Sequence, residues 1–176
     1  MEKIVIICST NRADSMSYQI SLLYQEVLKE MNVESQILDL KELPSDFAFS
    51  ALYENSGQNR DFNPFREVML KSKKFVFVVP EYNGSFPGVL KTFIDGLQFP
   101  DSFTDKKCAL VGVSAGIQGG GMALSHLTDI FNYCGMHVLA QKPKLSHINE
   151  HFQEGSMVNE LYSVLIKEQA EKLISF

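Results

Sequence analysis

The chain has 176 residues, 45% of them hydrophobic and 21% charged, a balance that is ordinary for a globular protein and argues against disorder. Its length predicts a single domain, residues 1–176, with a core buried between two layers of helices. Lys and Arg number 16 against 21 Asp and Glu, so the net charge is −5, which disfavours nucleic-acid binding because no basic cluster offsets it.

Neither a targeting segment nor a membrane segment stands out. A short apolar run of five residues follows Lys3, which is too brief for a signal peptide, and no apolar run reaches membrane-spanning length. The cysteines Cys8, Cys108 and Cys134 are odd in number and form no C-x-x-C motif, so neither a redox pair nor a zinc site is indicated. We therefore expect a soluble cytoplasmic protein without a membrane partner.

The first part of the chain alternates strand and helix patterns. Residues 4–8 are typical of a strand buried on both faces, and residues 36–40 alternate polar and apolar like an outer strand. Between them Ser15 or Ser17 can cap a helix with an apolar stripe formed by Met16, Ile20, Leu23, Val27 and Met31. Residues 41–63 are polar and poorly patterned, without an assigned role, and residues 64–72 predict a shorter helix.

The rest of the chain repeats this alternation. Apolar runs at 75–79 and 109–113 predict buried strands, and 137–140 predicts a short outer strand. Each is followed by a helical stripe: Phe86, Val89, Leu90, Phe93, Ile94 and Leu97; then Leu124, Leu127, Ile130 and Phe131; then Val158, Leu161, Tyr162, Leu165 and Ile166. We therefore predict an α/β fold, a flavodoxin-like doubly wound five-stranded parallel sheet in the order 2-1-3-4-5 with helices on both faces.

In such a sheet ligands bind outside the carboxyl ends of strands 1 and 3. The loop after the first strand, residues 9–17, reads Ser-Thr-Asn-Arg-Ala-Asp-Ser-Met-Ser. It gathers four hydroxyls and the Arg12 guanidinium at a helix N-terminus, which suits a terminal monophosphate. It lacks the glycines of a Walker loop or a dinucleotide turn. A helix N-cap with incidental polar neighbours is the alternative interpretation.

The loop after the third strand, residues 80–88, reads Pro-Glu-Tyr-Asn-Gly-Ser-Phe-Pro-Gly. Asn83 and Gly84 favour a tight turn with positive φ, and Pro87 suits the first turn of the next helix. Such a turn can aim backbone groups at the polar edge of a flat heterocycle, with Tyr82 nearby. An ordinary strand-to-helix turn remains the alternative.

Together these loops resemble a known family. Ser9-x-x-Arg12-x-x-Ser15-x-Ser17, the segment 80–85 and the downstream Pro87-Gly88-x-Leu90-Lys91 are similar to the NAD(P)H-dependent FMN reductases, a family that includes flavin, quinone, azo-dye and chromate reductases. The resemblance runs in register through residues 1–135 and weakens beyond. Cys8 departs from it, since the family often has a small residue there, and Ile117 and Gln118 interrupt the glycine-rich third loop.

The resemblance implies a set of residues that bind FMN. Those near its phosphate are Ser9, Thr10, Arg12, Ser15, Met16 and Ser17; those along the ring are Pro80, Glu81, Tyr82, Asn83, Gly84 and Ser85; the third loop adds Ser114, Ala115, Gly116 and Gly119. NADPH or NADH is then the electron donor, and a quinone, free flavin or similar small molecule is the acceptor. No catalytic acid or base is assigned, because the cofactor performs the redox step. The family also suggests a homodimer or homotetramer.

Three other functions compete with this hypothesis. A flavodoxin-like electron carrier also binds FMN but has no substrate of its own. Gly112-x-Ser114-x-Gly116 matches a nucleophile elbow, and Asp129 with His137, His147 or His151 gives the triad order of a serine hydrolase. His147-x-x-Glu150-His151 matches a zinc-peptidase pattern, but we interpret it as a polar loop before the last helix and expect no metal.

Overall fold

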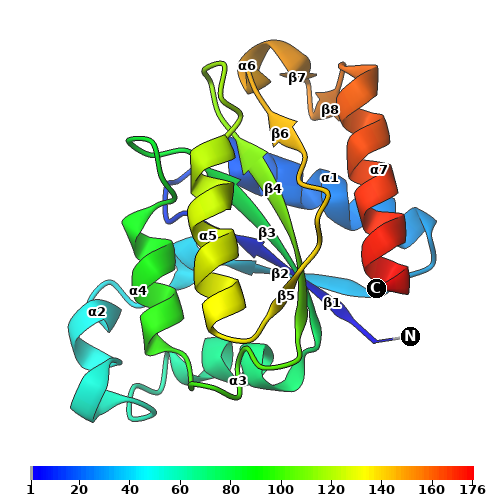
Figure 1. Cartoon of the computed structure of the whole chain (residues 1–176). Helices are drawn as coiled ribbons and strands as arrows, with labels where there is room; N and C mark the ends of the chain where they lie inside the picture. Colours follow the sequence, from blue (N-terminus) through cyan, green and yellow to red (C-terminus); the bar gives the residue numbers. More distant parts are fainter. Residues whose placement is uncertain (1) are drawn as a thin grey trace.

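The structure is a computed structural model that describes residues 2–176, and its centre is a twisted parallel sheet (Figure 1). The strands of this sheet run in the order β2-β1-β3-β4-β5, and β6 also pairs with β4. Their bounds are β1 Ile4–Cys8, β2 Ser35–Asp39, β3 Lys74–Pro80, β4 Lys107–Val113, β5 His137–Val138 and β6 Lys144–Leu145. The predicted α/β fold and strand order are confirmed.

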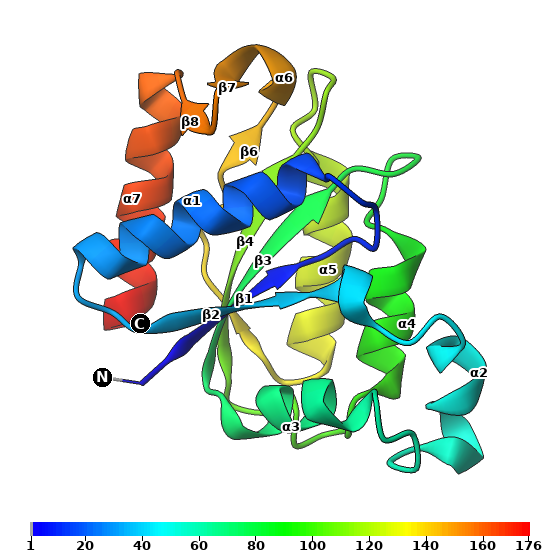
Figure 2. The same cartoon turned by 180° about the vertical axis from the view of Figure 1, so that it is seen from behind.

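Helices cover both faces of the sheet. They are α1 Met16–Glu30, α2 Phe47–Ser50, α3 Asn63–Lys71, α4 Gly88–Gly96, α5 Gly121–Tyr133, α6 Ile148–His151 and α7 Glu160–Ser175. One buried cluster joins the sheet to α3, α4 and α5, and a second joins the other face to α1 and α7. Figure 1 views the α4–α5 side, and Figure 2 views the α1 side from behind.

The edge strand beside β4 is interrupted, which the sequence did not predict. β5 pairs with the start of β4 and β6 with its end, and the chain leaves the sheet in between. Buried Gln169 on α7 fills this gap: its Nε2 donates to the carbonyls of Leu110 at 2.9 Å and Gln141 at 2.8 Å, while its Oε1 accepts from Tyr24. The Gln169 side chain thus supplies hydrogen bonds that a continuous edge strand would otherwise make, because buried carbonyls require a donor.

Two predicted helix faces are rotated or shifted. On α1 the fully buried apolar residues are Ile20, Tyr24 and Leu28, while the predicted Leu23 and Val27 are only partly buried. On α7 the predicted Tyr162 and Ile166 are buried, but the predicted Leu161 is 61% exposed, because that helix packs further through Ala170 and Leu173.

The stretch 41–63, which appeared unpatterned, also contributes to the core. It folds into two 3₁₀ turns, Leu40–Glu42 and Tyr53–Asn55, around the single-turn helix α2. Phe47, Leu52 and Phe62 are buried against α4, and the ring of Phe62 stacks on Phe47 with centroids 5.5 Å apart. Isolated apolar residues at irregular spacing gave no period to detect.

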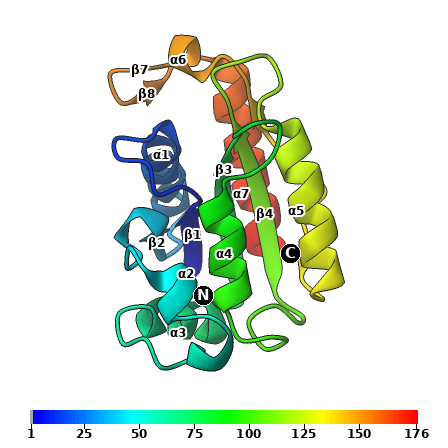
Figure 3. The same ribbon diagram turned by 90° about the vertical axis from the view of Figure 1, so that its left-hand side faces the viewer.

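The carboxyl end of the sheet gathers the loops that matter for function (Figure 3). Figure 3 shows the start of α1 at the same end of the molecule as α6 and the small hairpin of β7 Phe152–Gln153 and β8 Ser156–Met157, with α3 at the opposite end. Among residues 2–176 no helix combines the length and the apolar character that a membrane span requires.

Candidate functional site: a polar cleft at the carboxyl end of the sheet

A cavity of about 290 Å³ lies at the carboxyl ends of β1, β3 and β4. It is lined by the three predicted loops and by one segment that the sequence did not indicate. The lining residues are Thr10, Arg12, Asp14, Ser15, Met16, Ser17, Pro80, Glu81, Tyr82, Val113, Ser114, Ala115, Ile148 and Asn149. This is the strand-crossover position at which open α/β sheets bind ligands.

The first loop ends in a capped helix with a free hydroxyl. Ser15 is the N-cap of α1, and its Oγ accepts a hydrogen bond from the Tyr18 N–H at 3.1 Å. Ser17 is only 1% exposed, and its Oγ has no hydrogen-bond partner among residues 2–176. A buried hydroxyl without a partner is costly, so this position is suited to a ligand that supplies an acceptor.

Hydrogen bonds of the Thr10 side chain hold the first loop in place. The Thr10 and Tyr82 hydroxyls are 2.8 Å apart and join the first loop to the second. Thr10 Oγ1 also accepts from the Arg12 N–H at 3.2 Å, which fixes the backbone from which the guanidinium extends. Arg12 is exposed and forms no ion pair with another described residue, so its charge is free for an anion.

The second loop is a tight turn held from two sides. Asn83 and Gly84 have φ of 51° and 75°, as their residue types predict, and Tyr82 and Ser85 bond to each other across the turn. The Glu81 carboxylate accepts from the Gly120 N–H at 3.1 Å, which ties this loop to the third.

The third loop uses its serine to fold itself. Ser114 Oγ donates to the Gly116 carbonyl at 2.7 Å and accepts from the Gly119 N–H at 2.9 Å. No histidine ring bonds to it among the described residues, and α5 begins only at Gly121. The elements of a nucleophile elbow and triad are therefore not assembled around Ser114.

Ten of the sixteen predicted cofactor residues line the cavity, counting the predicted positions among its lining. Six do not. Ser9 is buried, with its Oγ bonded to the Ile7 carbonyl, and Gly119 packs against Lys144. The others are Asn83, Gly84, Ser85 and Gly116. Ser85 Oγ instead lies 2.9 Å from Nδ1 of His126 on α5.

Four lining residues were not predicted: Asp14, Val113, Ile148 and Asn149. Asp14 has a φ of 50° and belongs to the first loop, so its position there was available from the sequence. Ile148 and Asn149 reach the cavity because β6 pairs with the end of β4, and the Ile148 N–H then donates to the Ser114 carbonyl.

The cysteines and the His-Glu-His stretch take structural positions. All three cysteines are free, and burial, followed by the Asp39 carboxylate, raises the pKa of Cys8 to about 12, so it stays a thiol beside the site. The stretch 147–151 is the short helix α6 rather than a loop, and the ring of His151 meets that of Tyr162 edge-on at 5.3 Å. Within residues 2–176 no three His, Cys, Asp or Glu side chains gather as a metal site would require.

Fold and cleft together define a flavodoxin-like α/β protein with a polar cavity at the carboxyl ends of its central strands. A sequence model of the family described as NADPH-dependent FMN reductase matches residues 2–150. The chain belongs to this family.

Two relatives agree with the family assignment, and one solved structure agrees with the fold. The chain is 33% identical over 114 residues to an NAD(P)H-dependent FMN reductase of Pseudomonas aeruginosa, a match that covers 62% of this chain and 61% of that protein. It is 29% identical over 145 residues to an NAD(P)H:quinone oxidoreductase of Solanum tuberosum, covering 81% and 73%. In structure it is similar to the flavoenzyme NAD(P)H:(acceptor) oxidoreductase FerB of Paracoccus denitrificans, with a TM-score of 0.79, 20% identity and coverage of 99% and 96%.

Proposed function

We propose that the chain is one FMN-binding domain that oxidises NADPH or NADH and passes the electrons to a small acceptor such as a quinone or free flavin. The observation that carries the proposal is the Ser17 hydroxyl, which is buried, lines the cavity and lacks a partner at the first turn of α1. A helix N-terminus with a free hydroxyl and the nearby Arg12 guanidinium has the donors that a phosphate monoester requires.

The residues present fit FMN. Ser17, Arg12 and the first-turn amides of α1 would hold the phosphate, and Pro80, Glu81 and Tyr82 would lie along the ring. The cavity of about 290 Å³ is at the small end for a cofactor pocket, which suits a phosphate and its chain while leaving the ring near open surface. When bound, FMN supplies the redox chemistry by accepting hydride from a dihydronicotinamide.

The protein's part in that chemistry is to hold and orient. The Thr10–Tyr82 contact and the Glu81–Gly120 bond fix the three loops relative to one another, so the ligand meets preorganised donors.

A visible spectrum tests the proposal. The purified protein is mixed with FMN, excess flavin is removed, and NADPH and then NADH are added without oxygen. We expect retained yellow colour that bleaches on mixing and returns with a quinone. Colour that persists with both donors would identify an electron carrier, and a protein that retains no flavin would contradict both functions.

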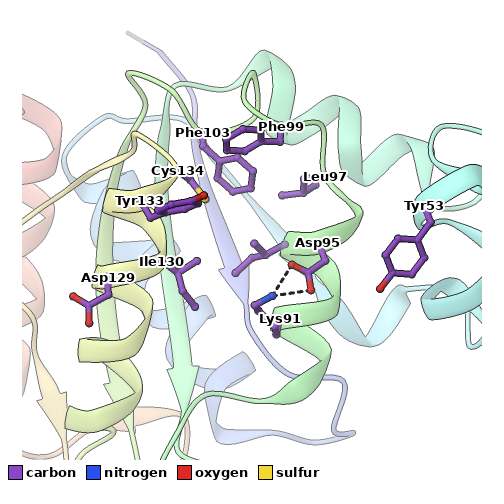
Figure 4. A pocket seen from close by; sticks show the side chains of 11 residues that line it. Tyr53, Lys91, Asp95, Leu97, Phe99, Phe103, Asp129, Ile130, Tyr133 and Cys134 are labelled. Atoms are coloured by element: carbon purple, nitrogen blue, oxygen red, sulfur yellow. Dashed lines mark hydrogen bonds and ion pairs between the residues drawn. The ribbon is translucent and has the colours of Figure 1, made fainter.

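We also propose that the chain forms a homodimer or homotetramer through the groove between α4 and α5 (Figure 4). The groove holds about 740 Å³, and large aromatic residues around it lie open to solvent: Tyr53 is 82% exposed, Tyr133 86% and Phe99 64%. Exposed apolar patches of this kind mark interaction sites. In Figure 4 the ion pair between Lys91 and Asp95 lies along α4, on one side of the groove. Polar groups at the edge of an apolar patch are typical of an interface rim.

Light scattering during size-exclusion chromatography tests this assembly. Tyr133→Glu should convert the oligomer to monomers, whereas Leu161→Glu, an exposed apolar position on α7, should leave it assembled. A wild-type chain that stays monomeric at micromolar concentration contradicts the proposal.

The three free thiols support a cytoplasmic location, which we include in the proposal.

A further inference from the structure

A further hollow lies on the other side of the third loop, between α5 and the segment that joins β5 to β6. Its volume is about 390 Å³, and it is lined by Gly121, Leu124, Ser125, Thr128, Asp129, Ala140, Lys142 and Lys144. It coincides with the stretch where the edge strand leaves the sheet, between Val138 and Lys144. The interruption of the strand thus places polar side chains in a recess beside the sheet.

The recess carries unpaired positive charge in a protein whose net charge is −5. Neither Lys142 nor Lys144 forms an ion pair among residues 2–176, and the Lys142 ammonium reaches only the Ala140 carbonyl, at 3.4 Å. One carboxylate, Asp129, lines the same hollow, so the two lysines outnumber it. A recess lined by one predominant charge concentrates counter-ions.

Hydroxyl groups complete the polar lining. Ser125 Oγ makes no hydrogen bond with another described residue, so it can donate to a ligand, whereas the Thr128 hydroxyl is used by the Leu124 carbonyl at 2.7 Å. Two ammonium groups and a free hydroxyl together form a donor set with the chemistry of a phosphate site.

The hollow and the cofactor cavity share the third loop as their common wall. Ser114 and Ala115 line the cofactor cavity, and Gly121, the first residue of α5 directly after the loop, lines the hollow. The loop is packed directly on the lysine segment: a Cβ at Gly119 would lie 2.7 Å from the Lys144 carbonyl carbon. A ligand in the hollow is therefore next to the loop that borders the reaction site.

We infer that this hollow binds the phosphate groups on the adenosine side of NAD(P)H, with Lys142 and Lys144 as their ligands. The inference rests on the proposed function, because it assigns the phosphates of the electron donor to a site beside its reaction site. The nicotinamide reaches the flavin cavity on one side of the third loop, and the phosphates lie on the other side. The Ser125 hydroxyl adds a donor there.

The test uses the double variant Lys142→Gln/Lys144→Gln of the FMN-loaded protein. Calorimetric titration with 2′,5′-ADP, which carries the phosphates but no nicotinamide, measures the site without any reaction. We expect the double variant to bind 2′,5′-ADP at least about tenfold more weakly than the wild type, since charge-assisted contacts are lost. The KM for NADPH should rise by a similar factor. The matched control is Lys167→Gln, an exposed lysine on α7 that forms no ion pair with a described residue.

The outcomes separate this inference from the proposed function. If the wild type oxidises NADPH while the double variant keeps its KM and its affinity for 2′,5′-ADP, the hollow is not the phosphate site. An equal loss in Lys167→Gln overturns it as well, because net charge would then be the cause. Wild-type protein that binds FMN but oxidises neither NADPH nor NADH refutes the proposed function, whatever the calorimetry shows.

Discussion

The N-terminus of α1 and the C-terminus of α3 differ in how their polar groups find hydrogen-bond partners. At the N-terminus of α1 the Ser17 hydroxyl is buried, and neither it nor the nearby Arg12 guanidinium has a hydrogen-bond or ion-pair partner among residues 2–176. At the C-terminus of α3 the Lys106 ammonium, 1% exposed, donates to the carbonyls of Met69 and Leu70. The protein completes the second helix end from within, whereas at the first, beyond the Ser15 cap, we propose that an external anion supplies the partner.

The contrast shows what a lone unpaired group can and cannot indicate. Ser102 Oγ is also buried without a partner, but it lies in the loop before β4 and lines none of the described cavities. Ser17 differs because a cavity, a helix N-terminus and an unpaired cation meet at the same place. It is this coincidence of features that indicates a ligand.

Substitution of Lys106 at the C-terminus of α3 should have the larger effect on stability. Lys106→Met keeps the apolar stem but removes the donor from two buried carbonyls, so the free energy of unfolding should fall by about 2–3 kcal/mol. Urea denaturation measures this. Lys71→Met, at the end of α3 itself but exposed and paired with Glu67, should change stability by less than about 0.5 kcal/mol. Equal denaturation midpoints for Lys106→Met and the wild type would contradict the role of Lys106.

Substitutions near the N-terminus of α1 should change the affinity for FMN rather than the stability of the protein. Arg12→Gln removes a charged contact to the FMN phosphate, and because Arg12 is exposed we expect the lower end of the range, about tenfold weaker binding. Quenching of FMN fluorescence measures the affinity. Arg60→Gln, an exposed arginine in the 41–63 stretch, serves as the control for net charge. An affinity that Arg12→Gln leaves unchanged would remove Arg12 from the phosphate site.

The same contrast explains which parts of the molecule the sequence could predict. Residues 75–79 and 109–113 predicted β3 and β4 because strands buried on both faces are apolar without interruption. The first loop was predictable because its hydroxyls and Arg12 are contiguous. Asn149 was not, because it reaches the cavity through the two-residue strand β6, which has no local signal.

Helix faces were predicted less well than helix positions. The α1 stripe through Leu23 and Val27 is real but only partly buried, because α1 packs against both the sheet and α7 and so turns Tyr24 and Leu28 inward. Tyr24 is tolerated there because its hydroxyl donates to Gln169. Periodicity locates a helix, whereas the partners that decide its inward face come from distant sequence.

Ser17→Ala tests the N-terminus of α1 with a smaller and more specific change. Because the Ser17 hydroxyl has no partner in the protein, its removal should leave the stability of the cofactor-free chain unchanged or slightly higher. FMN affinity should nevertheless fall by about fivefold, the equivalent of one neutral hydrogen bond of roughly 1 kcal/mol. Ser21→Ala, one turn further along, removes a hydroxyl that bonds the Ser17 carbonyl and should leave FMN affinity intact. Lower stability without weaker binding would show that Ser17 is structural.

A further prediction concerns the pH dependence of stability at Lys106. Burial, with a further contribution from Lys73, lowers the pKa of Lys106 from 10.5 to about 8. Between these two values the unfolded chain holds more protons than the folded one, so the free energy of unfolding should rise with pH in that window. The neutral amine still donates to the α3 carbonyls, so the cap survives deprotonation. Urea midpoints at pH values below 8 and near 9.5 should therefore show a greater increase for the wild type than for Lys106→Met, which lacks the titrating group. Parallel pH profiles for the two proteins would mean that the ammonium is stabilised by the helix C-terminus as strongly as burial penalises it.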